Sequence, residues 1–369
     1  MQNSDKNINP TKIICFFNST KSWGGGEKWH YDMATALDQK SIRVFAVTNK
    51  KSELFHKLKE QKIKIFSIKI SNISFLNPFK IAKISRILKK EKTSTIIINL
   101  PADLKVAGPA AKLAGVKKII YRRGSAIPIK NTFLNRILFA YFIDEVIANS
   151  QATKNTILAN NPSLINPEKI KIIYNGVEDP SNHISYTPIY QKQPTELVIG
   201  NAGRFVRQKN HKFLIDLAEK LDKEGLNFKL LLAGNGKLKQ ETIDYAVEKK
   251  VDGKIIFPGF IENIKSFMHS IDIYILPSLW EGFGYVLVEA MACKKPVIAF
   301  NLSSNPEIIE DNKTGYLVKK NDLNQVIHKI RLLAESPALR EKMGEEGIKR
   351  VKKLFTFERV IEQIIQTIE

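Results

Sequence analysis

The sequence is poor in cysteine and has no long apolar run. Its two cysteines among 369 residues are too few for a disulfide framework or a zinc site. The longest apolar stretches, such as residues 271–277, are far shorter than the roughly 20 residues that a membrane-spanning helix needs. Residues 1–10 are polar and lack the apolar core of a secretory signal. We therefore expect a cytoplasmic protein that is at most peripheral to the inner face of a membrane.

Acidic residues are scarce in the first half of the chain. Residues 1–180 hold 30 Lys and Arg against 13 Asp and Glu, whereas residues 181–369 hold 28 against 24. The net charge of +21 therefore lies mostly in the first half, where it favours an anionic partner. A nucleic-acid-binding protein is one alternative, but the sequence has no RNA-binding motif and no basic stripe interleaved with aromatic residues. We expect no nucleic acid among the partners.

One basic segment combines charge with helical spacing. In residues 80–90, Ile81, Ile84 and Leu88 fall on one stripe of a helix, and lysines and an arginine surround that stripe. The pattern is typical of a docked surface helix with solvated lysines. It is also typical of attachment to an anionic membrane surface, where each nearby Lys or Arg adds about 1 kcal/mol. The sequence leaves both interpretations open.

Short β-branched runs alternate with segments of helical period along the chain, which is typical of parallel sheets covered by helices. Residues 181–195 interrupt the alternation with polar residues and prolines, which predicts a linker. We therefore expect an α/β protein with two Rossmann-like, doubly wound domains that bind ligands in a cleft beyond the carboxyl ends of their strands. The predicted strands are residues 13–17, 44–47, 63–68, 95–100, 118–121, 146–148, 170–174, 197–199, 228–233, 255–257, 273–276 and 297–300.

A glycine-rich loop follows the first predicted strand. Residues 23–27, WGGGE, precede a helix that we expect to start near Lys28. Gly25 and Gly26 let the backbone approach a ligand closely, and the N-terminus of the helix offers free amides to an anion. A flexible turn explains the glycines equally well.

Two loops in the second half carry groups suited to a diphosphate. Gly203 and Arg204 follow a predicted strand and Lys209 precedes a helix, so a planar guanidinium and an ammonium group can converge on one pyrophosphate. Gly234 and Gly236 form a partial dinucleotide fingerprint, without a third glycine or an acidic partner for a ribose. Tight packing of a strand against a helix is the alternative role of these two glycines.

The loop before a helix that begins near Tyr285 is the most informative part of the sequence. Glu281 lies in this loop and Glu289 in the early turns of the helix. Glu281 can accept hydrogen bonds from sugar hydroxyls and Glu289 from a ribose diol, while the amides around Phe283 and Gly284 can hold a phosphate. A carboxylate beside phosphates is costly unless it meets hydroxyl donors, which favours a glycosylated nucleotide as the ligand.

In this order the motifs resemble glycosyltransferase family 4, also described as glycosyl transferases group 1, whose members have the GT-B fold and retain the anomeric configuration. The resemblance covers nearly the whole chain and is densest in the second half. The matching segments are WGGGE at 23–27, NGV at 175–177, GRF at 203–205 with Lys209, GNG at 234–236, FPG at 257–259, and EGFG at 281–284 with Glu289.

The resemblance implies transfer of a sugar from a nucleotide-sugar to a hydroxyl of a saccharide or lipid-linked acceptor, in bacterial cell-surface glycan synthesis such as that of lipopolysaccharide. It implies an acceptor domain at 1–180, a donor domain at 181–355 and a last helix, 356–369, that returns to the first domain. No cofactor and no obligatory metal are implied. An epimerase of nucleotide-sugars with similar architecture is the alternative enzyme, and it would need no acceptor.

The resemblance also implies a role for each site residue. Arg204, Lys209 and Glu281 would be catalytic, the two cations by stabilising the leaving diphosphate. Glu281 would also hold the donor sugar. The remaining donor-binding residues implied are Gly25, Gly26, Gly203, Gly234, Phe283, Gly284, Tyr285 and Glu289.

One position departs from the family pattern. Many members have a histidine before a glycine after the fifth strand, whereas this chain has Arg122 and Arg123 before Gly124. Arginine cannot act as a base at neutral pH because its pKa exceeds about 12. Both arginines, together with Glu27, are candidates for contacts with the acceptor, and a plain surface position for one of the two arginines stays open.

The six histidines show no metal-binding spacing, so we expect no metal site. His211 follows the loop that contains Lys209, where it can contact a nucleotide or pack in the core, and packing is the favoured role. His30, in the helix after the glycine-rich loop, is ambiguous in the same way.

Overall fold

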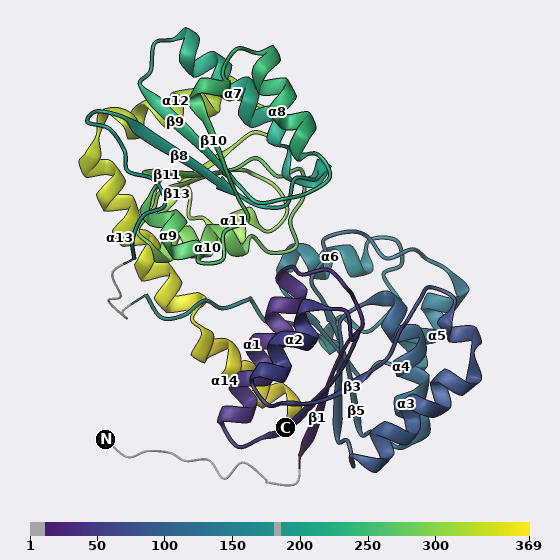
Figure 1. Cartoon of the computed structure of the whole chain (residues 1–369). Helices are drawn as coiled ribbons and strands as arrows, with labels where there is room; N and C mark the ends of the chain where they lie inside the picture. Colours follow the sequence, from purple (N-terminus) through teal and green to yellow (C-terminus); the bar gives the residue numbers. More distant parts are fainter. Residues whose placement is uncertain (1–11, 181–185) are drawn as a thin grey trace, which may run out of the picture. The chain divides into compact units, whose positions relative to one another are not determined.

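A computed structural model describes residues 12–180 and 186–369 of the chain. The chain forms two compact units. Unit 1 holds the described residues up to Tyr174 together with Val360–Glu369, and unit 2 holds Asn175–Arg359. Each unit contains one parallel sheet with helices on its faces (Figure 1).

The sheet of unit 1 has seven parallel strands in the order β3-β2-β1-β4-β5-β6-β7. Because β1 lies between β2 and β4, the helices that follow the early and the later strands cover opposite faces. The fourth strand, TIII, is buried at every position, as a strand covered on both faces must be. The strands are β1 (Ile13–Asn18), β2 (Arg43–Thr48), β3 (Lys64–Ser67), β4 (Thr95–Ile98), β5 (Lys118–Arg123), β6 (Glu145–Ala148) and β7 (Ile170–Ile172).

The sheet of unit 2 has six parallel strands in the order β10-β9-β8-β11-β12-β13. The predicted strands of this half are present, but sequence reasoning missed β13, a four-residue strand that begins with a glycine. The strands are β8 (Leu197–Ala202), β9 (Phe228–Ala233), β10 (Ile255–Gly259), β11 (Ile273–Leu276), β12 (Val297–Phe300) and β13 (Gly315–Val318).

Local capping fixes where several helices begin. Ser52, Asn77 and Thr132, for example, each accept a hydrogen bond from a backbone N–H in the first turn of the helix that follows. In unit 1 the helices are α1 (Gly25–Gln39), α2 (Glu53–Glu60), α3 (Pro78–Lys90), α4 (Pro101–Ala114), α5 (Phe133–Tyr141) and α6 (Gln151–Leu158). Those that follow are α7 (His211–Lys223), α8 (Lys239–Glu248), α9 (Ile264–His269), α10 (Tyr285–Ala292), α11 (Asn305–Ile308), α12 (Leu323–Glu335), α13 (Pro337–Leu354) and α14 (Phe357–Ile368).

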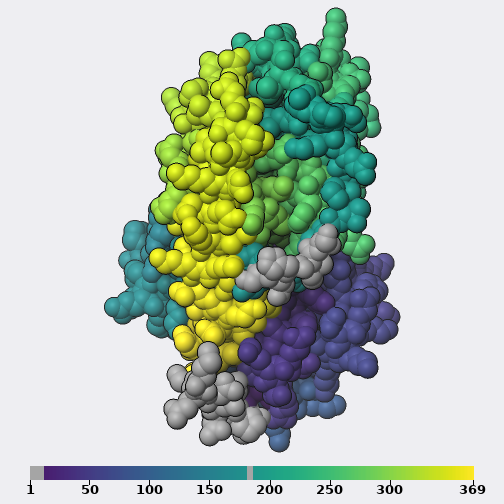
Figure 2. All heavy atoms as spheres, turned by 90° about the vertical axis from the view of Figure 1, so that its left-hand side faces the viewer, coloured from purple at the N-terminus to yellow at the C-terminus, as the bar shows by residue number. Residues whose placement is uncertain are grey.

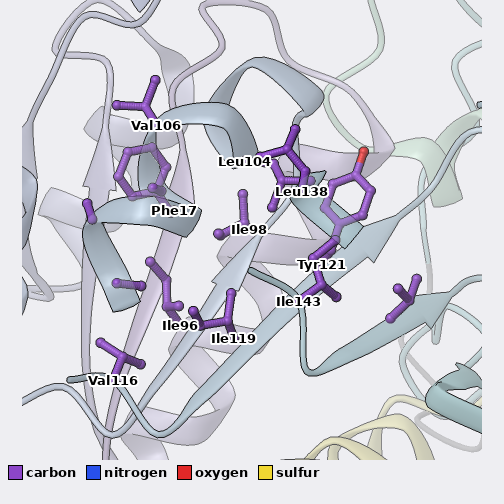
Figure 3. Packing of buried hydrophobic residues seen from close by; sticks show 14 of the residues in the cluster. Phe17, Ile96, Ile98, Leu104, Val106, Val116, Ile119, Tyr121, Leu138 and Ile143 are labelled. Atoms are coloured by element: carbon purple, nitrogen blue, oxygen red, sulfur yellow. The ribbon is translucent and has the colours of Figure 1, made fainter. Parts of the chain in front are cut away.

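One apolar core of unit 1 lies between its sheet and the helices α3 to α6. Figure 3 shows Phe17, Ile98 and Leu104 gathered within it. Ile84 and Leu88 of α3 are fully buried in the same core, so the apolar stripe predicted for residues 80–90 faces the sheet. The basic side chains of α3 therefore lie around the solvent side of a docked helix.

The last helix returns the chain to unit 1. In Figures 1 and 2 the yellow end of α14 lies beside the purple N-terminal segment, and Lys12 Nζ donates to Ile368 O at 3.3 Å. Near the boundary of the units, Val177 N–H donates to Phe355 O at 2.9 Å and Phe357 N–H donates to Val177 O at 2.8 Å. A Cβ on Gly176 would lie 2.8 Å from Cα of Phe357, so only glycine permits this close pairing.

Candidate active site

The loops after β8, β9 and β10 are joined by backbone hydrogen bonds at the carboxyl edge of the unit 2 sheet. Gly203 N–H donates to Ala233 O at 2.9 Å, and Gly234 N–H donates to Gly259 O at 2.6 Å. Gly234 has φ +126°, and a Cβ at this position would lie 2.0 Å from Gly203 O. Gly234 is therefore required for close packing between loops, whereas the alternative stated from the sequence was packing of a strand against a helix.

Lys209 and Glu281 form the central ion pair of unit 2. Lys209 Nζ lies 2.6 Å from Glu281 Oε1, and both side chains are largely buried. Lys209 ends the 3-10 turn η3 (Arg207–Lys209), whose Gln208 donates to Trp280 O at 2.8 Å and to Glu281 Oε2 at 3.4 Å. The turn after β8 thus holds the loop after β11 in place, and it brings together two residues predicted from separate motifs.

Arg204 and Glu289 lie on the two elements that flank this pair. Arg204 is exposed, and its side chain has no hydrogen bond or ion pair to the described residues. Glu289 is on α10, and its charge together with that of Glu281 acts on the buried hydroxyl of Tyr274. Burial is the main reason that the pKa of Tyr274 is raised, so its hydroxyl stays protonated and donates to Ala202 O at 3.0 Å.

The segment from Phe283 to Tyr285 forms the N-terminus of α10. Phe283 is buried and packs edge-to-face against Tyr285 and Phe355, each with ring centroids 5.8 Å away. Tyr285 N–H donates to Phe283 O at 3.0 Å, so this amide is used within the turn. A Cβ on Gly284 would lie 2.9 Å from Leu287 Cδ1, which gives this glycine a packing role as well.

The glycine-rich segment of unit 1 belongs to a helix rather than to a loop. We predicted a helix start near Lys28, but α1 begins at Gly25, so Gly25 and Gly26 lie in its first turn. Gly26 allows close contact with Asn99, the residue after β4, because a Cβ at position 26 would lie 2.8 Å from Asn99 Nδ2. Glu27 is buried and accepts a hydrogen bond from Asn18 Nδ2 at 3.0 Å.

The two arginines of β5 are buried, so the surface position that the sequence left open for one of them is wrong. Arg122 is 1% exposed, donates to Asn99 Oδ1 at 3.0 Å and stacks over Trp29 at 4.5 Å. Arg123 is 9% exposed and donates to Tyr121 Oη at 3.3 Å and to Ile127 O at 2.5 Å. β5 ends later than we predicted, and the buried end of the strand includes both side chains.

A buried carboxyl group lies beside the first turn after β1. Asp103 is fully buried and accepts hydrogen bonds from the backbone N–H of Ser19, at 2.9 Å, and from the Ser19 hydroxyl. Burial raises the pKa of Asp103 to about 7, hydrogen bonds from Ser19 oppose the shift, and the charge of Glu27 adds to it. This carboxyl group therefore changes its charge near neutral pH.

Comparison with known proteins decides the family. The model for "Glycosyl transferases group 1" matches residues 185–350, and that for "Glycosyltransferase Family 4" matches residues 23–179. An uncharacterised glycosyltransferase of Methanocaldococcus jannaschii is 31% identical over 300 residues, which are 79% of this chain and 80% of the relative. The chain belongs to the group 1 glycosyltransferases. It is therefore an enzyme, and the recognition from sequence motifs is confirmed.

Two further comparisons bear on this glycosyltransferase. An Escherichia coli relative named UDP-Gal:alpha-D-GlcNAc-diphosphoundecaprenol alpha-1,3-galactosyltransferase is 24% identical over 310 residues, which are 77% of this chain and 80% of the relative. The crystal structure of Anabaena HepE in complex with UDP and glucose superposes with a TM-score of 0.81 at 20% identity, covering 96% of this chain and 98% of HepE. The structural likeness confirms the GT-B fold.

The site residues that sequence reasoning missed in the glycosyltransferase are mostly amides at strand ends. Asn18 and Asn99 end or follow β1 and β4 and contact Glu27 and Arg122. Gln208 binds the Glu281 loop. A signal was available, because an asparagine follows the apolar run of several predicted strands. Asp103 gave no such signal, since it lies in the first turn of α4.

Both histidines near the site pack rather than project into solvent. His211 stacks on Phe205 with ring centroids 4.0 Å apart, and burial, followed by the charge of Lys209, lowers its pKa to about 4. His30 packs edge-to-face on Phe16, and its pKa is lowered well below the ordinary value, mainly by burial and then by Arg122. Packing, the role favoured for His211 from the sequence, is what the structure shows.

Residues 12–180 and 186–369 contain no cluster of three or more His, Cys, Asp or Glu side chains arranged to hold a metal ion. Over the same residues, no helix of the glycosyltransferase combines the length and apolarity needed to cross a bilayer.

Proposed function

We propose that this glycosyltransferase moves a sugar from a nucleotide-sugar to a hydroxyl group of a saccharide or lipid-linked acceptor, with retention of the anomeric configuration. The observation that carries the proposal is the buried Lys209–Glu281 pair at 2.6 Å, held at the carboxyl edge of the unit 2 sheet. Open α/β sheets bind ligands at this edge. Support also comes from the names of two similar proteins, one of which binds UDP and glucose.

Lys209 and Arg204 are the groups suited to the departing diphosphate. Lys209 uses one of its three N–H donors on Glu281, which leaves two for phosphate oxygens. Arg204 is exposed on the adjacent turn and offers a planar set of donors. Because negative charge grows on the diphosphate as the bond to the anomeric carbon breaks, prearranged cations stabilise the transition state more than the ground state.

Glu281 is the group suited to the donor sugar. One of its oxygens binds Lys209 at 2.6 Å, whereas among the described residues the other has only a long contact to Gln208, at 3.4 Å. That second oxygen can accept a hydrogen bond from a sugar hydroxyl. Glu289, on the helix that follows, is suited to the ribose. On the front-face route, the acceptor oxygen bonds to the anomeric carbon while the leaving phosphate takes the acceptor proton.

We assign acceptor binding to unit 1. We also assign the enzyme to bacterial cell-surface glycan synthesis. Buried Arg122 and Arg123 end β5, and Glu27 lies in the first turn of α1, so these candidates share the carboxyl edge of one sheet. An acceptor that carries phosphate, such as the diphosphoundecaprenol named for the Escherichia coli relative, suits the basic charge of this half. We assign the enzyme to the inner face of the cytoplasmic membrane.

Product analysis tests the proposal. We expect a panel of nucleotide-sugars to contain one that raises the melting temperature of the protein, because a ligand that binds only the folded state stabilises it. That donor should give a glycosylated product with retained configuration when diphosphate-linked lipid saccharides are added. An epimerised nucleotide-sugar formed from donor alone would instead support the epimerase alternative and contradict the proposal.

A further inference from the structure

A lysine-lined hollow lies at the carboxyl ends of β1, β2 and β3, and none of its lining residues is assigned to the reaction. Its volume is about 240 Å³. Four lysines from three different loops converge on it, and a buried asparagine, a serine and an isoleucine complete the wall. The lining residues are Lys21, Asn49, Lys50, Lys51, Ser67, Ile68 and Lys69.

The charge of this hollow is not balanced by the fold. All four lysines are exposed, and none forms an ion pair with the described residues. Residues 67–69 form one wall, and the surrounding segment 61–90, which continues into α3, includes eight Lys or Arg and no Asp or Glu. Four ammonium groups around one cavity repel each other unless an anion joins them, so the hollow is suited to a phosphate-bearing group.

Three large apolar side chains project into solvent a few residues after Lys69, the last residue that lines the hollow. Ile73, Leu76 and Phe79 are 71%, 70% and 83% exposed. The turn that carries them is fixed, because the buried hydroxyl of Ser74 accepts hydrogen bonds from Ser71 N–H at 2.9 Å and from the side chain of Lys80 at 2.9 Å. Exposed apolar groups on a fixed turn indicate a surface that binds another molecule or a membrane.

We propose that the lysine-lined hollow and the apolar turn, Ile73 to Phe79, form one docking surface for an anionic phospholipid bilayer. The hollow receives lipid phosphates, and the three apolar side chains enter the hydrocarbon beside them. Charge complementarity is the argument for this occupant, since a protein partner would have to bring acidic groups and an apolar patch together. The surface lies at the sheet edge that carries Asn18 and the first turn of α1, which brings a membrane-embedded acceptor toward unit 1; this last step rests on the proposed function.

Sedimentation with vesicles tests the docking surface on the full chain. We expect binding to phosphatidylcholine vesicles that contain about one third phosphatidylglycerol, weaker binding as salt increases, and little binding to pure phosphatidylcholine. The variant K50Q/K51Q/K69Q should bind at least about tenfold more weakly at low salt. Its control is K352Q/K353Q, which removes two adjacent exposed lysines from α13 of unit 2 and should bind as the wild type does.

Leucine substitutions distinguish insertion of the apolar turn into the bilayer from non-specific hydrophobic adsorption. Leu76 and Leu113 are both 70% exposed and both belong to unit 1, but Leu113 lies in the last turn of α4, near the amino ends of the strands. We expect Leu76→Ser, especially together with Phe79→Ser, to lower the vesicle partition coefficient by about tenfold. Leu113→Ser should leave it unchanged. An equal loss in both variants, or none in either, would overturn the proposal.

Two further measurements keep this inference separate from the proposed function. Stabilisation by the nucleotide-sugar donor reports on the donor site and not on the docking surface, so it should be the same in the vesicle-binding variants. If donor binding is normal and no vesicle composition is bound, the docking surface is wrong while the proposed function stands. Stabilisation by inorganic pyrophosphate without vesicle binding would contradict the bilayer and indicate a soluble phosphate-bearing ligand. A dimer that L76S/F79S dissociates would contradict it too and indicate a second copy of the chain.

Discussion

The two units use charge in different ways. In unit 2, lysines and glutamates pair within the fold, from the buried Lys209–Glu281 contact to the surface pairs of α13 such as Lys294–Glu345. In unit 1, residues 61–90 have no acidic side chain, and most of the exposed large apolar side chains of the described residues belong to this unit. The comparison indicates that unit 2 balances much of its charge within the fold, whereas part of unit 1 carries basic charge that the fold does not balance.

Breaking the buried ion pair of unit 2 should give the largest effect. We expect Lys209→Ala to lower the rate of sugar transfer about 100- to 1,000-fold, because it removes a cation from the departing diphosphate. Steady-state transfer assays measure the loss. The control is Lys249→Ala, which breaks the ion pair with Glu219, at 3.0 Å, on the far side of α7. Near-normal turnover of Lys209→Ala, with a melting temperature close to that of the wild type, would remove Lys209 from the reaction.

A substitution that disturbs loop packing in unit 2 should give the second-largest effect. We expect Gly234→Ala to lower the free energy of unfolding by about 3 kcal/mol, because its positive φ and the 2.0 Å approach to Gly203 O leave no room for a methyl group. Gly253→Ala is the matched control, since a Cβ there meets nothing within 4 Å. Urea unfolding of both variants measures the difference, and equal values would show that the loop contact is not restrictive.

Unit 1 should respond to pH through Asp103. The unfolded chain loses this proton near pH 3.8, whereas the folded chain keeps it up to about pH 7. Because the folded state binds more protons between these values, Asp103 makes the free energy of unfolding fall as pH rises from about 4 to 7. The stability of Asp103→Asn relative to the wild type should therefore increase over that range in urea unfolding. An equal trend in Asp38→Asn, at the exposed end of α1, would contradict the assignment.

Unit 2 should show a smaller pH effect of opposite sign through His211. Its pKa is about 4 in the folded chain against 6.5 when unfolded, so the unfolded chain takes up the proton first as pH falls. The stability contribution of neutral His211 is complete above pH 6.5 and is lost as pH falls toward 4. Thermal melting at pH 7.5 and pH 5 should show a smaller acid shift for His211→Gln than for the wild type. His328→Gln, an exposed change on α12, is the control.

Much of the architecture could be predicted from the sequence because continuous β-branched runs mark buried parallel strands. The strand at 315–318 was missed because GYLV is short and begins with glycine, and its pairing with β12 comes from tertiary packing. The start of α1 was predicted three residues late. Glycines are poor helix formers, and the close approach of Gly26 to Asn99, which accounts for one of the two glycines in the first turn, is set by tertiary packing.

Candidate site residues could be predicted where a single sequence motif contains them. Contacts between residues of separate elements could not be predicted. Glu281 and Lys209 were identified from two motifs, but no spacing rule states that they form an ion pair. Burial of Arg122 and Arg123 was not predictable either, because charged side chains are mostly exposed unless partners such as Asn99, Tyr121 and the carbonyl of Ile127 are present. Asn99 and Ile127 lie outside β5, and Tyr121 lies two residues before Arg123 on the same strand, so only the fold brings the three partners to the arginines.

The backbone hydrogen bonds of Val177 with Phe355 and Phe357 join two segments that are far apart in the sequence. The chain passes between the units twice, after Tyr174 and after Arg359, and both passages lie within a few residues of this bridge. The two connecting segments share backbone hydrogen bonds, so a change in the backbone of one is transmitted to the other. A side chain at position 176 would meet the backbone of Phe357 and force the two segments apart.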